Sequence, residues 1–345
     1  MAEKRNPAIV CCRTASMFLI ILCHTIANFT FIPGSGFLDQ IFNVGVFSFL
    51  AISGYLYGGK TIHRFSDWFR NRYFSVMLPA TALTIFVLIA ELCMGNRYSA
   101  FSILIHLLNL QGLGFLYPRI YSFFSEIPVL GPLWFISVIM LCYCLVPALQ
   151  KIRGRCLAWR NMSLYITGVV IVGFAFTMLT GFNIIYFLTF SVGYYLSAKD
   201  RLKPIRISGF LLLSVLMFAA QIFRLVLRNK YDGLPLYQNY SLLSHMSLGI
   251  WILCFFFLVN QLFPNFTDRI AGSKIMIALN DISFYVYLTH YFFCSGLLNA
   301  YRLTDNLLVN TAVFSLATLA SAVVLKKVAK FLQHTLSSFF TVSHS

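Results

Sequence analysis

The chain has 345 residues, of which 59% are hydrophobic and 10% are charged. A soluble globular domain carries about 25% charged residues, so this composition excludes an ordinary soluble domain and indicates a polytopic membrane protein. The formal net charge is +16, but the basic residues lie between apolar stretches and no RNA- or DNA-binding motif accompanies them. We therefore expect no nucleic-acid partner.

The nine cysteines do not predict a metal centre. Most of them lie inside apolar runs, and they show neither the spacing of metal ligands nor the density of a disulfide scaffold. A free cysteine usually acts as a small buried hydrophobe. We interpret these cysteines as packing residues and expect no metal ion.

Ten apolar stretches are interpreted as membrane spans, since a bilayer core requires about 20 apolar residues. In chain order they are residues 8–29, 38–59, 74–95, 131–150, 163–181, 183–198, 206–226, 240–262, 274–297 and 306–328. A further apolar stretch, 99–117, is interrupted by asparagine, glutamine and glycine, and we expect a re-entrant or interfacial segment in an outer loop. The predicted fold class is an all-α, polytopic transmembrane helical bundle. It forms a single integral-membrane domain over residues 1–345, with no appended soluble domain.

The distribution of Lys and Arg predicts the orientation in the membrane. Nineteen of these residues lie in one set of alternate loops and five lie in the other set. Basic residues concentrate in the cytoplasmic loops of membrane proteins, so both termini are expected in the cytoplasm. The same distribution accounts for most of the net charge.

The first predicted span, 8–29, carries Arg13 and His24 inside its apolar run. An arginine at the centre of a membrane helix costs about 2.5 to 3.5 kcal/mol on insertion scales, so such residues usually face a protein interior or a wet cavity. An interval of eleven residues brings both side chains to one helix face, about 16 Å apart along the axis. With the termini inside, Arg13 lies toward the cytoplasm and His24 lies in the outer half.

The ninth predicted span, 274–297, carries His290, which lies 16 residues after Lys274. This places His290 close to the expected depth of His24, and we predict that the two histidines share a cavity. An imidazole can take a proton from a hydroxyl group or carry an acyl group covalently. The alternative is that each histidine only forms a hydrogen bond to a neighbouring helix and serves packing.

Small and basic residues mark the cytoplasmic end of the second span. The pairs Ser53-Gly54 and Gly58-Gly59 would permit close helix approach. Lys60, Arg64, Arg70 and Arg72 follow. They either anchor the helices at the membrane surface or form a phosphate site, because arginine matches phosphate oxygens bidentately. Arg224, near the outer end of the seventh span, is expected to extend its side chain to the membrane surface and is given no chemical role.

Five stretches occur in the order found in a known family. They are the Arg13-x10-His24 pair, GVFSFLAISGYL at 45–56, FRNRYFSVMLP at 69–79, GPLWFISVIMLCYCLVP at 131–147 and SFYVYLTHYF at 283–292. Together these stretches resemble the acyltransferase-3 membrane O-acyltransferases, which modify bacterial surface glycans and some lipids or small molecules. The resemblance runs through most of the chain.

The resemblance implies an O-acetyltransferase of the bacterial inner (cytoplasmic) membrane, in contact with membrane lipid. Acetyl-CoA would bind from the cytoplasm as the acyl donor, with Arg13 along its thioester arm. The residues expected to bind the donor are Arg70, Arg72, Arg64, Lys60 and Ser53. His24 would accept the acyl group or act as a base, with His290 as a further catalytic residue. The acceptor would be a hydroxyl of a surface glycan or of a lipid-linked glycan precursor on the outer side.

Two alternatives stay open from the sequence. In a polysaccharide or small-molecule transporter, Arg13, His24 and His290 would line a permeation path as a proton relay. The sequence shows neither an internal repeat nor a pair of matching broken helices, which many secondary transporters have. An enzyme of the same fold that transfers a succinyl or another acyl group would carry the same motifs. The oligomeric state is left open.

Overall fold

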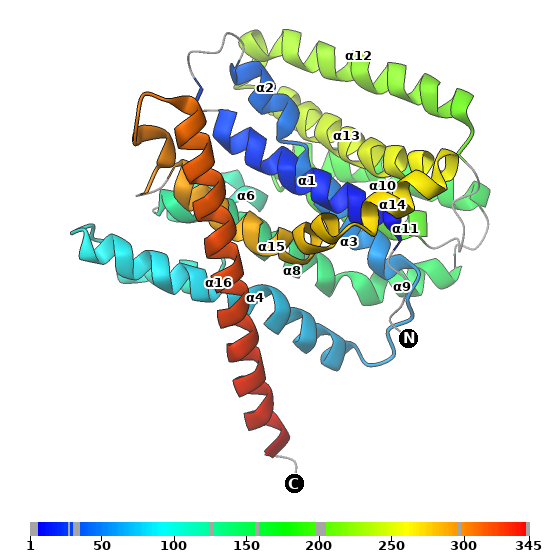
Figure 1. Ribbon diagram of the computed structural model, residues 1–345. Helices are drawn as coiled ribbons and strands as arrows, with labels where there is room; N and C mark the ends of the chain where they lie inside the picture. The colour runs from blue at the N-terminus through cyan, green and yellow to red at the C-terminus, as the bar shows by residue number, and fades with distance from the viewer. Residues whose placement is uncertain are drawn as a thin grey trace. The chain divides into compact units, whose positions relative to one another are not determined.

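The computed structural model describes residues 6–26, 28–29, 35–124, 127–155, 159–197, 205–295 and 298–342. All regular secondary structure in these ranges is helical (Figure 1). The chain groups into two compact units, which are described separately below. The first comprises Met1–Cys23, Phe31–Ile62 and Leu145–Asp281, and the second comprises His24–Thr30, His63–Cys144 and Ile282–Ser345.

Two continuous helices, α1 (Pro7–Ile26) and α15 (Lys274–Cys294), contribute residues to both units. The other helices of the first unit are α2 (Ser35–Phe42), α3 (Gly45–Gly58), α9 (Val146–Arg155), α10 (Trp159–Thr180), α11 (Ile185–Ser197), α12 (Ile207–Tyr231), α13 (Pro235–Leu262) and α14 (Pro264–Ala271). Those of the second unit are α4 (Phe65–Cys93), α5 (Ala100–Leu107), α6 (Gly112–Leu116), η1 (Pro118–Ile120), α7 (Tyr121–Phe124), η2 (Pro128–Leu133), α8 (Trp134–Cys144), η3 (Ala300–Arg302) and α16 (Leu307–Val342). The single domain expected over residues 1–345 stays a prediction.

Six helices are long and apolar enough to cross a membrane, and they support a multi-pass membrane protein. They are α1, Leu38–Gly58, α4, α12, α13 and Leu307–Leu336 of α16. A bent pair, Pro128–Cys144 with Val146–Arg153, would make a seventh span. The predicted spans 163–181, 183–198 and 274–297 coincide with helices that fall outside this test of length and hydropathy. The number of ten spans and the cytoplasmic termini therefore stay predictions.

Helix α3 packs along α11 and α13 in the first unit. A Cβ atom at Gly54 would lie 2.0 Å from the carbonyl oxygen of Phe190, and one at Gly193 would lie 2.1 Å from the carbonyl oxygen of Ala51. The backbones of α3 and α11 therefore touch directly, which only glycine allows at these positions. The prediction that small residues of the second span permit close helix approach is confirmed.

Helix α1 joins the same core through its buried apolar face. Ile9 and Cys12 pack with Ala51 and Ile52 of α3 and with Leu253 of α13. All eight cysteines in the described part of the chain are free, and five of them are buried. The packing role predicted for cysteine is confirmed for these five.

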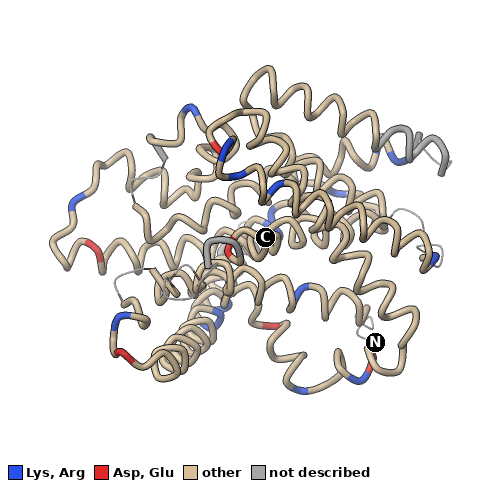
Figure 2. The backbone as a smooth tube through the Cα atoms, turned by 90° about the horizontal axis from the view of Figure 1, so that it is seen from above, with Lys and Arg blue, Asp and Glu red and all other residues tan. Residues whose placement is uncertain are grey.

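In the second unit, α4 crosses α16, as Figure 1 shows. The second half of α15 packs into this unit through Phe292, whose ring contacts that of Phe86 on α4 at 6.1 Å. Lys and Arg lie mainly at helix ends and in connections, and acidic residues are few (Figure 2). Exceptions are Arg13 within α1 and Lys326, Lys327 and Lys330 in the middle of α16.

The interrupted stretch 99–117 forms two short helices, α5 and α6, which are separated at Asn109. Asn109 has a φ of +51°, a left-handed conformation that asparagine tolerates better than most residues. The hydroxyl of Ser137 on α8 donates a hydrogen bond to the Asn109 carbonyl oxygen and accepts one from the Gly112 amide. The break therefore anchors the segment to α8, and its re-entrant or interfacial location stays a prediction.

Glu91, at the end of α4, is buried and binds the loop that follows. The Tyr98 hydroxyl and the Asn96 side-chain amide donate hydrogen bonds to its Oε2 atom, at 2.7 and 2.5 Å. Burial of Tyr98 and its contact with Glu91 raise the pKa of Tyr98 from 10 to about 12. A raised pKa means that the folded state holds the phenol proton more tightly than the unfolded state does.

We expect Tyr98→Phe to lower the free energy of unfolding by about 1 kcal/mol at neutral pH, because a hydrogen bond to Glu91 is lost. This difference is fully present below pH 10 and declines as the pH rises toward 12, the pKa of folded Tyr98. Thermal unfolding of both proteins between pH 7 and 11 measures it. A deficit of constant size over this range would contradict the prediction.

Candidate functional site

His24 on α1 and His290 on α15 lie side by side in the second unit. Their ring centroids are 5.3 Å apart, with the ring planes tilted by 34°. The ring of Tyr291 lies edge-on to His24 at 5.0 Å. His290 is fully buried and His24 is half-buried. The structure thus brings together the two histidines that the sequence placed at equal depth.

The hydrogen bonding of His290 fixes its tautomer. Its Nδ1 atom lies 2.6 Å from the backbone carbonyl oxygen of Tyr287. A carbonyl oxygen can only accept, so Nδ1 carries the proton and Nε2 keeps its lone pair. Nε2 is buried and has no hydrogen-bond partner among the described residues. A neutral imidazole held in this way presents a proton-accepting atom.

Tyr287 holds this part of α15 against the beginning of α8. Its hydroxyl donates a hydrogen bond to the carbonyl oxygen of Pro132, and its ring contacts that of Phe135 at 5.6 Å. Sequence reasoning missed this residue. The available signal was spacing, because residues three apart share a helix face and Tyr287 precedes His290 by three.

The first unit contains a cavity of about 590 Å³ that Arg13 lines. The residues around it are Asn6, Ile9, Val10, Arg13, Tyr55, Leu56, Gly59, Lys60, Ser197, Asn280 and Asp281. They come from the beginning of α1, the end of α3, the end of α11 and the first half of α15. Arg13 and Lys60, both proposed from the sequence, therefore line one cavity. Ser53 is not among its lining residues.

The electrostatics of this cavity favour an anion. Two cationic side chains, Arg13 and Lys60, face one carboxylate, Asp281. The first turn of α1 also lies here, and the Asn6 side chain caps it by accepting a hydrogen bond from the Ala8 amide at 3.0 Å. The remaining amides and the helix dipole add positive potential at this end of α1.

Asn280 and Asp281 were not assigned to this site from the sequence. Their position on α15 carried a usable signal, because they precede His290 by ten and nine residues, much as Arg13 precedes His24 by eleven. Because the two intervals are similar, two packed helices that carry them can bring their polar residues together at one site and their histidines together at another. The structure shows both: α1 and α15 supply the cavity residues in one unit and the histidine pair in the other.

Residues 6–326 match a family model described as an acyltransferase domain, of the acyltransferase-3 type. The chain belongs to this acyltransferase family. The matched range includes Arg13, His24, His290 and every residue that lines the cavity. Searches among curated proteins and among solved structures returned no significant match.

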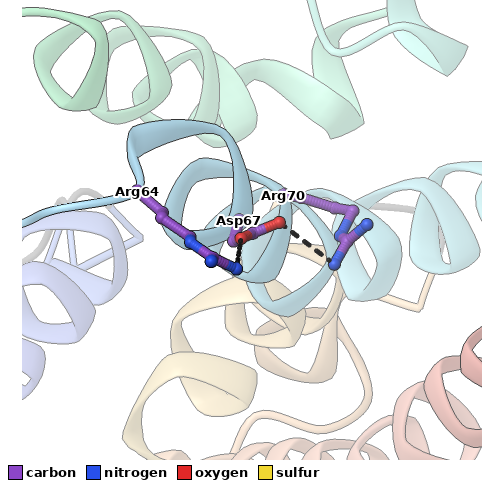
Figure 3. Close-up of polar contacts among 3 residues, drawn as sticks. All are labelled: Arg64, Asp67 and Arg70. Carbon is purple, nitrogen blue, oxygen red and sulfur yellow. Dashed lines mark ion pairs between the residues drawn. The ribbon is translucent and has the colours of Figure 1, made fainter.

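Membership confirms the enzyme class expected from the five stretches: the protein is a membrane acyltransferase. In this acyltransferase, Arg64 immediately precedes α4 and Arg70 lies in its second turn, both in the second unit. Both contact Asp67, at nitrogen–oxygen distances of 3.9 and 3.5 Å (Figure 3). All three side chains are substantially exposed, and such surface ion pairs contribute about 0 to 1 kcal/mol, so both guanidinium groups remain accessible.

Arg72 does not share a helix face with Arg70. An interval of two residues turns the side chain by about 200° around α4, and Arg72 is half-buried whereas Arg70 is exposed. The expectation that both guanidinium groups lie near one set of phosphates therefore requires a ligand that contacts two sides of this helix. Their role in binding stays a proposal.

The expectation that Arg224 extends to the membrane surface is wrong. Arg224 is fully buried in the first unit. Its guanidinium donates hydrogen bonds to Gln221, Gln40 and Ser241. Residues of α2 and α13 thus enclose a side chain that the sequence placed near the end of an apolar helix.

Proposed function

We propose that this acyltransferase moves an acetyl group from cytoplasmic acetyl-CoA to a hydroxyl of a surface glycan, or of its lipid-linked precursor. The acceptor would lie on the outer side of the bacterial inner membrane. The observation that carries the proposal is on α1, which presents Arg13 to an anion-favouring cavity and His24 to a second histidine. Family membership favours this enzyme over the transporter considered from the sequence.

The cavity in the first unit suits the donor. Its volume of about 590 Å³ falls within the range of roughly 300 to 1,000 Å³ that is common for small-molecule sites. CoA carries several phosphates, and Arg13, Lys60 and the amino end of α1 supply the positive charge that phosphate oxygens require. Arg64, Arg70 and Arg72 are proposed as additional phosphate contacts.

The histidine pair suits acyl transfer to a hydroxyl. In direct transfer, a histidine nitrogen takes the hydroxyl proton, the oxygen attacks the thioester carbonyl, and the carbon–sulfur bond breaks to release CoA. In double displacement, a His24 nitrogen attacks the thioester carbonyl and the carbon–sulfur bond breaks to release CoA; the acceptor hydroxyl then loses its proton to a base and attacks the acetyl carbonyl, and the carbon–nitrogen bond breaks to free His24. The lone pair on His290 Nε2 supports a base in either route. Along α1 the interval from Arg13 to His24 corresponds to about 16 Å. A donor that contacts Arg13 must extend over this distance to bring its thioester to His24.

Incubation of the purified protein with radiolabelled acetyl-CoA and candidate glycans tests the proposal. We expect label on the glycan and a product heavier by one acetyl group. A product heavier by a succinyl group, formed from succinyl-CoA, would replace the acetyl assignment. Proton-coupled uptake into vesicles, without transfer from any CoA thioester, would overturn the proposed enzyme function.

Arg13→Gln is expected to weaken acetyl-CoA binding by roughly 10- to 100-fold, because a charge-assisted hydrogen bond contributes about 1.5 to 3 kcal/mol. The measurement is the rise in apparent Tm with acetyl-CoA concentration. Arg119→Gln is the matched control, since Arg119 is exposed and does not line the cavity. Equal ligand-dependent stabilisation of the Arg13→Gln protein and the wild type would contradict the assigned donor site.

A further inference from the structure

Arg224 is the buried charge that the proposed reaction does not use. On α12 it donates from Nε to Gln221 Oε1 at 3.2 Å and from its terminal nitrogens to Gln40 Oε1 at 3.3 Å and Ser241 Oγ at 3.5 Å. It also donates to the backbone carbonyl oxygen of Gln40 at 3.1 Å. Among the described residues all of these acceptors are neutral. A cation buried in a membrane protein is costly, so its contacts call for a functional explanation.

The contacts of Arg224 converge on the end of α2. Gln40 lies in the last turn of this helix, where carbonyl oxygens have no partner within the helix. Its carbonyl oxygen accepts a hydrogen bond from Arg224 of α12 and also lies 3.0 Å from Nε2 of His245 on α13. A cation at a helix carboxyl end is favourable because it opposes the helix dipole. Two helices thus hold one carbonyl group at the end of a third.

The residue before Gln40 connects α2 to α1. Asp39 Oδ1 accepts a hydrogen bond from the Cys23 thiol at 3.0 Å, and the Gln40 side-chain amide donates to Asp39 Oδ2 at 3.4 Å. Cys23 immediately precedes His24 on α1. A continuous set of contacts therefore runs from Arg224, through the end of α2, to the residue bonded to His24.

We propose that Arg224 and His245 are positioning residues that fix the end of α1, and with it His24, through Gln40 and Asp39. This inference rests on the proposed function for its effect on the reaction. A catalytic group that is misplaced by about 1 Å can cost roughly 100-fold in rate. Neither Arg224 nor His245 need touch substrate to have that effect.

The contact route is tested without any activity measurement. In the full-length protein, Arg224→Gln is expected to make Cys23 react several-fold faster with N-ethylmaleimide, as read by peptide mass spectrometry. Cys12, fully buried nearer the beginning of α1, should stay protected. Arg228→Gln, one turn further along α12, is the matched control and should leave Cys23 protected. An unchanged Cys23 rate, or equal exposure of Cys12 and Cys23, would overturn the proposal.

Kinetics then distinguish positioning from general stabilisation. Arg224→Gln should lower kcat by up to roughly 100-fold and leave the KM for acetyl-CoA unchanged, because Arg13 and Lys60 are untouched. Asp39→Asn should weaken the same link and lower kcat in the same direction. A change confined to KM would contradict positioning. If the wild type transfers no acyl group, the proposed function fails, and Cys23 reactivity still decides the contact route.

Discussion

Replacing His24 by alanine is expected to abolish most acyl transfer, with a fall in kcat of roughly 10²- to 10⁴-fold, the usual contribution of a positioned acid–base group. The imidazole adjoins His290 at 5.3 Å between ring centroids, and alanine offers no nitrogen to a proton or an acyl group. Donor binding should persist, because the cavity residues lie on other turns. Initial rates and the acetyl-CoA-dependent rise in Tm separate the two effects.

A matched control is His106→Gln. His106 is also buried in the second unit, and its Nδ1 lies 2.9 Å from the Ser102 carbonyl oxygen within its own helix. This replacement should leave transfer unchanged, because the His106 ring is held by a hydrogen bond within its own helix and is given no part in the reaction. Transfer at the wild-type rate by a folded His24→Ala protein would remove His24 from the mechanism.

The two routes of acyl transfer differ in whether a labelled acetyl group becomes bound to the protein. If His24 carries the acetyl group, a His290→Gln protein given labelled acetyl-CoA without acceptor should accumulate label on the peptide that contains His24. If transfer is direct, no protein-bound label should form. The lone pair at His290 Nε2 serves both routes, so this labelling and not the geometry distinguishes them.

The helical period made the histidine pair predictable. Arg13 and His24 share a face of α1 because eleven residues complete three turns with little remainder. Counting along apolar spans then gave His290 its depth. Depth alone does not say which neighbouring side chains surround a residue, so the cavity position of Asp281 was not predicted. That information depends on how α1, α3 and α15 pack.

Arg224 is a second residue whose neighbours the sequence did not predict. Its place near the end of an apolar helix predicts a position near the membrane surface, where long basic side chains often extend into water. The sequence does not show that α2 folds over this end and that Gln40 and Ser241 offer acceptors to the guanidinium. The local pattern was therefore insufficient, and a contact between residues 184 positions apart decided the outcome.

Short helices explain why the number of spans is harder to predict than their order. The predicted span 131–150 is broken after Cys144, and the helix that resumes at Val146 carries Pro147, which cannot donate a backbone hydrogen bond. Gly181, at a φ of +75°, ends the preceding helical segment before α11. Apolar composition identifies each segment, but the backbone breaks set its length.

Replacing Gly58 by valine is expected to cause a large loss of stability in the first unit. A Cβ atom at Gly58 would lie 1.9 Å from the carbonyl oxygen of Tyr194 and 2.9 Å from the Cβ of Ser197. The nearest neighbour is backbone, so no side chain can rotate away and α3 must separate from α11. Overpacking typically costs about 1 to 3 kcal/mol, and a backbone clash of this size should reach or exceed the upper value.

Gly168→Ala on α10 is the matched control, because nothing lies within 4 Å of a Cβ at that position. There alanine should raise the free energy of unfolding by about 0.5 to 1 kcal/mol through its higher helix propensity. The two glycine replacements are thus expected to shift apparent Tm in opposite directions. Since Gly59 and Ser197 line the cavity, separation of α3 from α11 should also weaken acetyl-CoA binding. Gly58→Val with wild-type Tm and donor affinity would show that these helices do not pack at the observed distance.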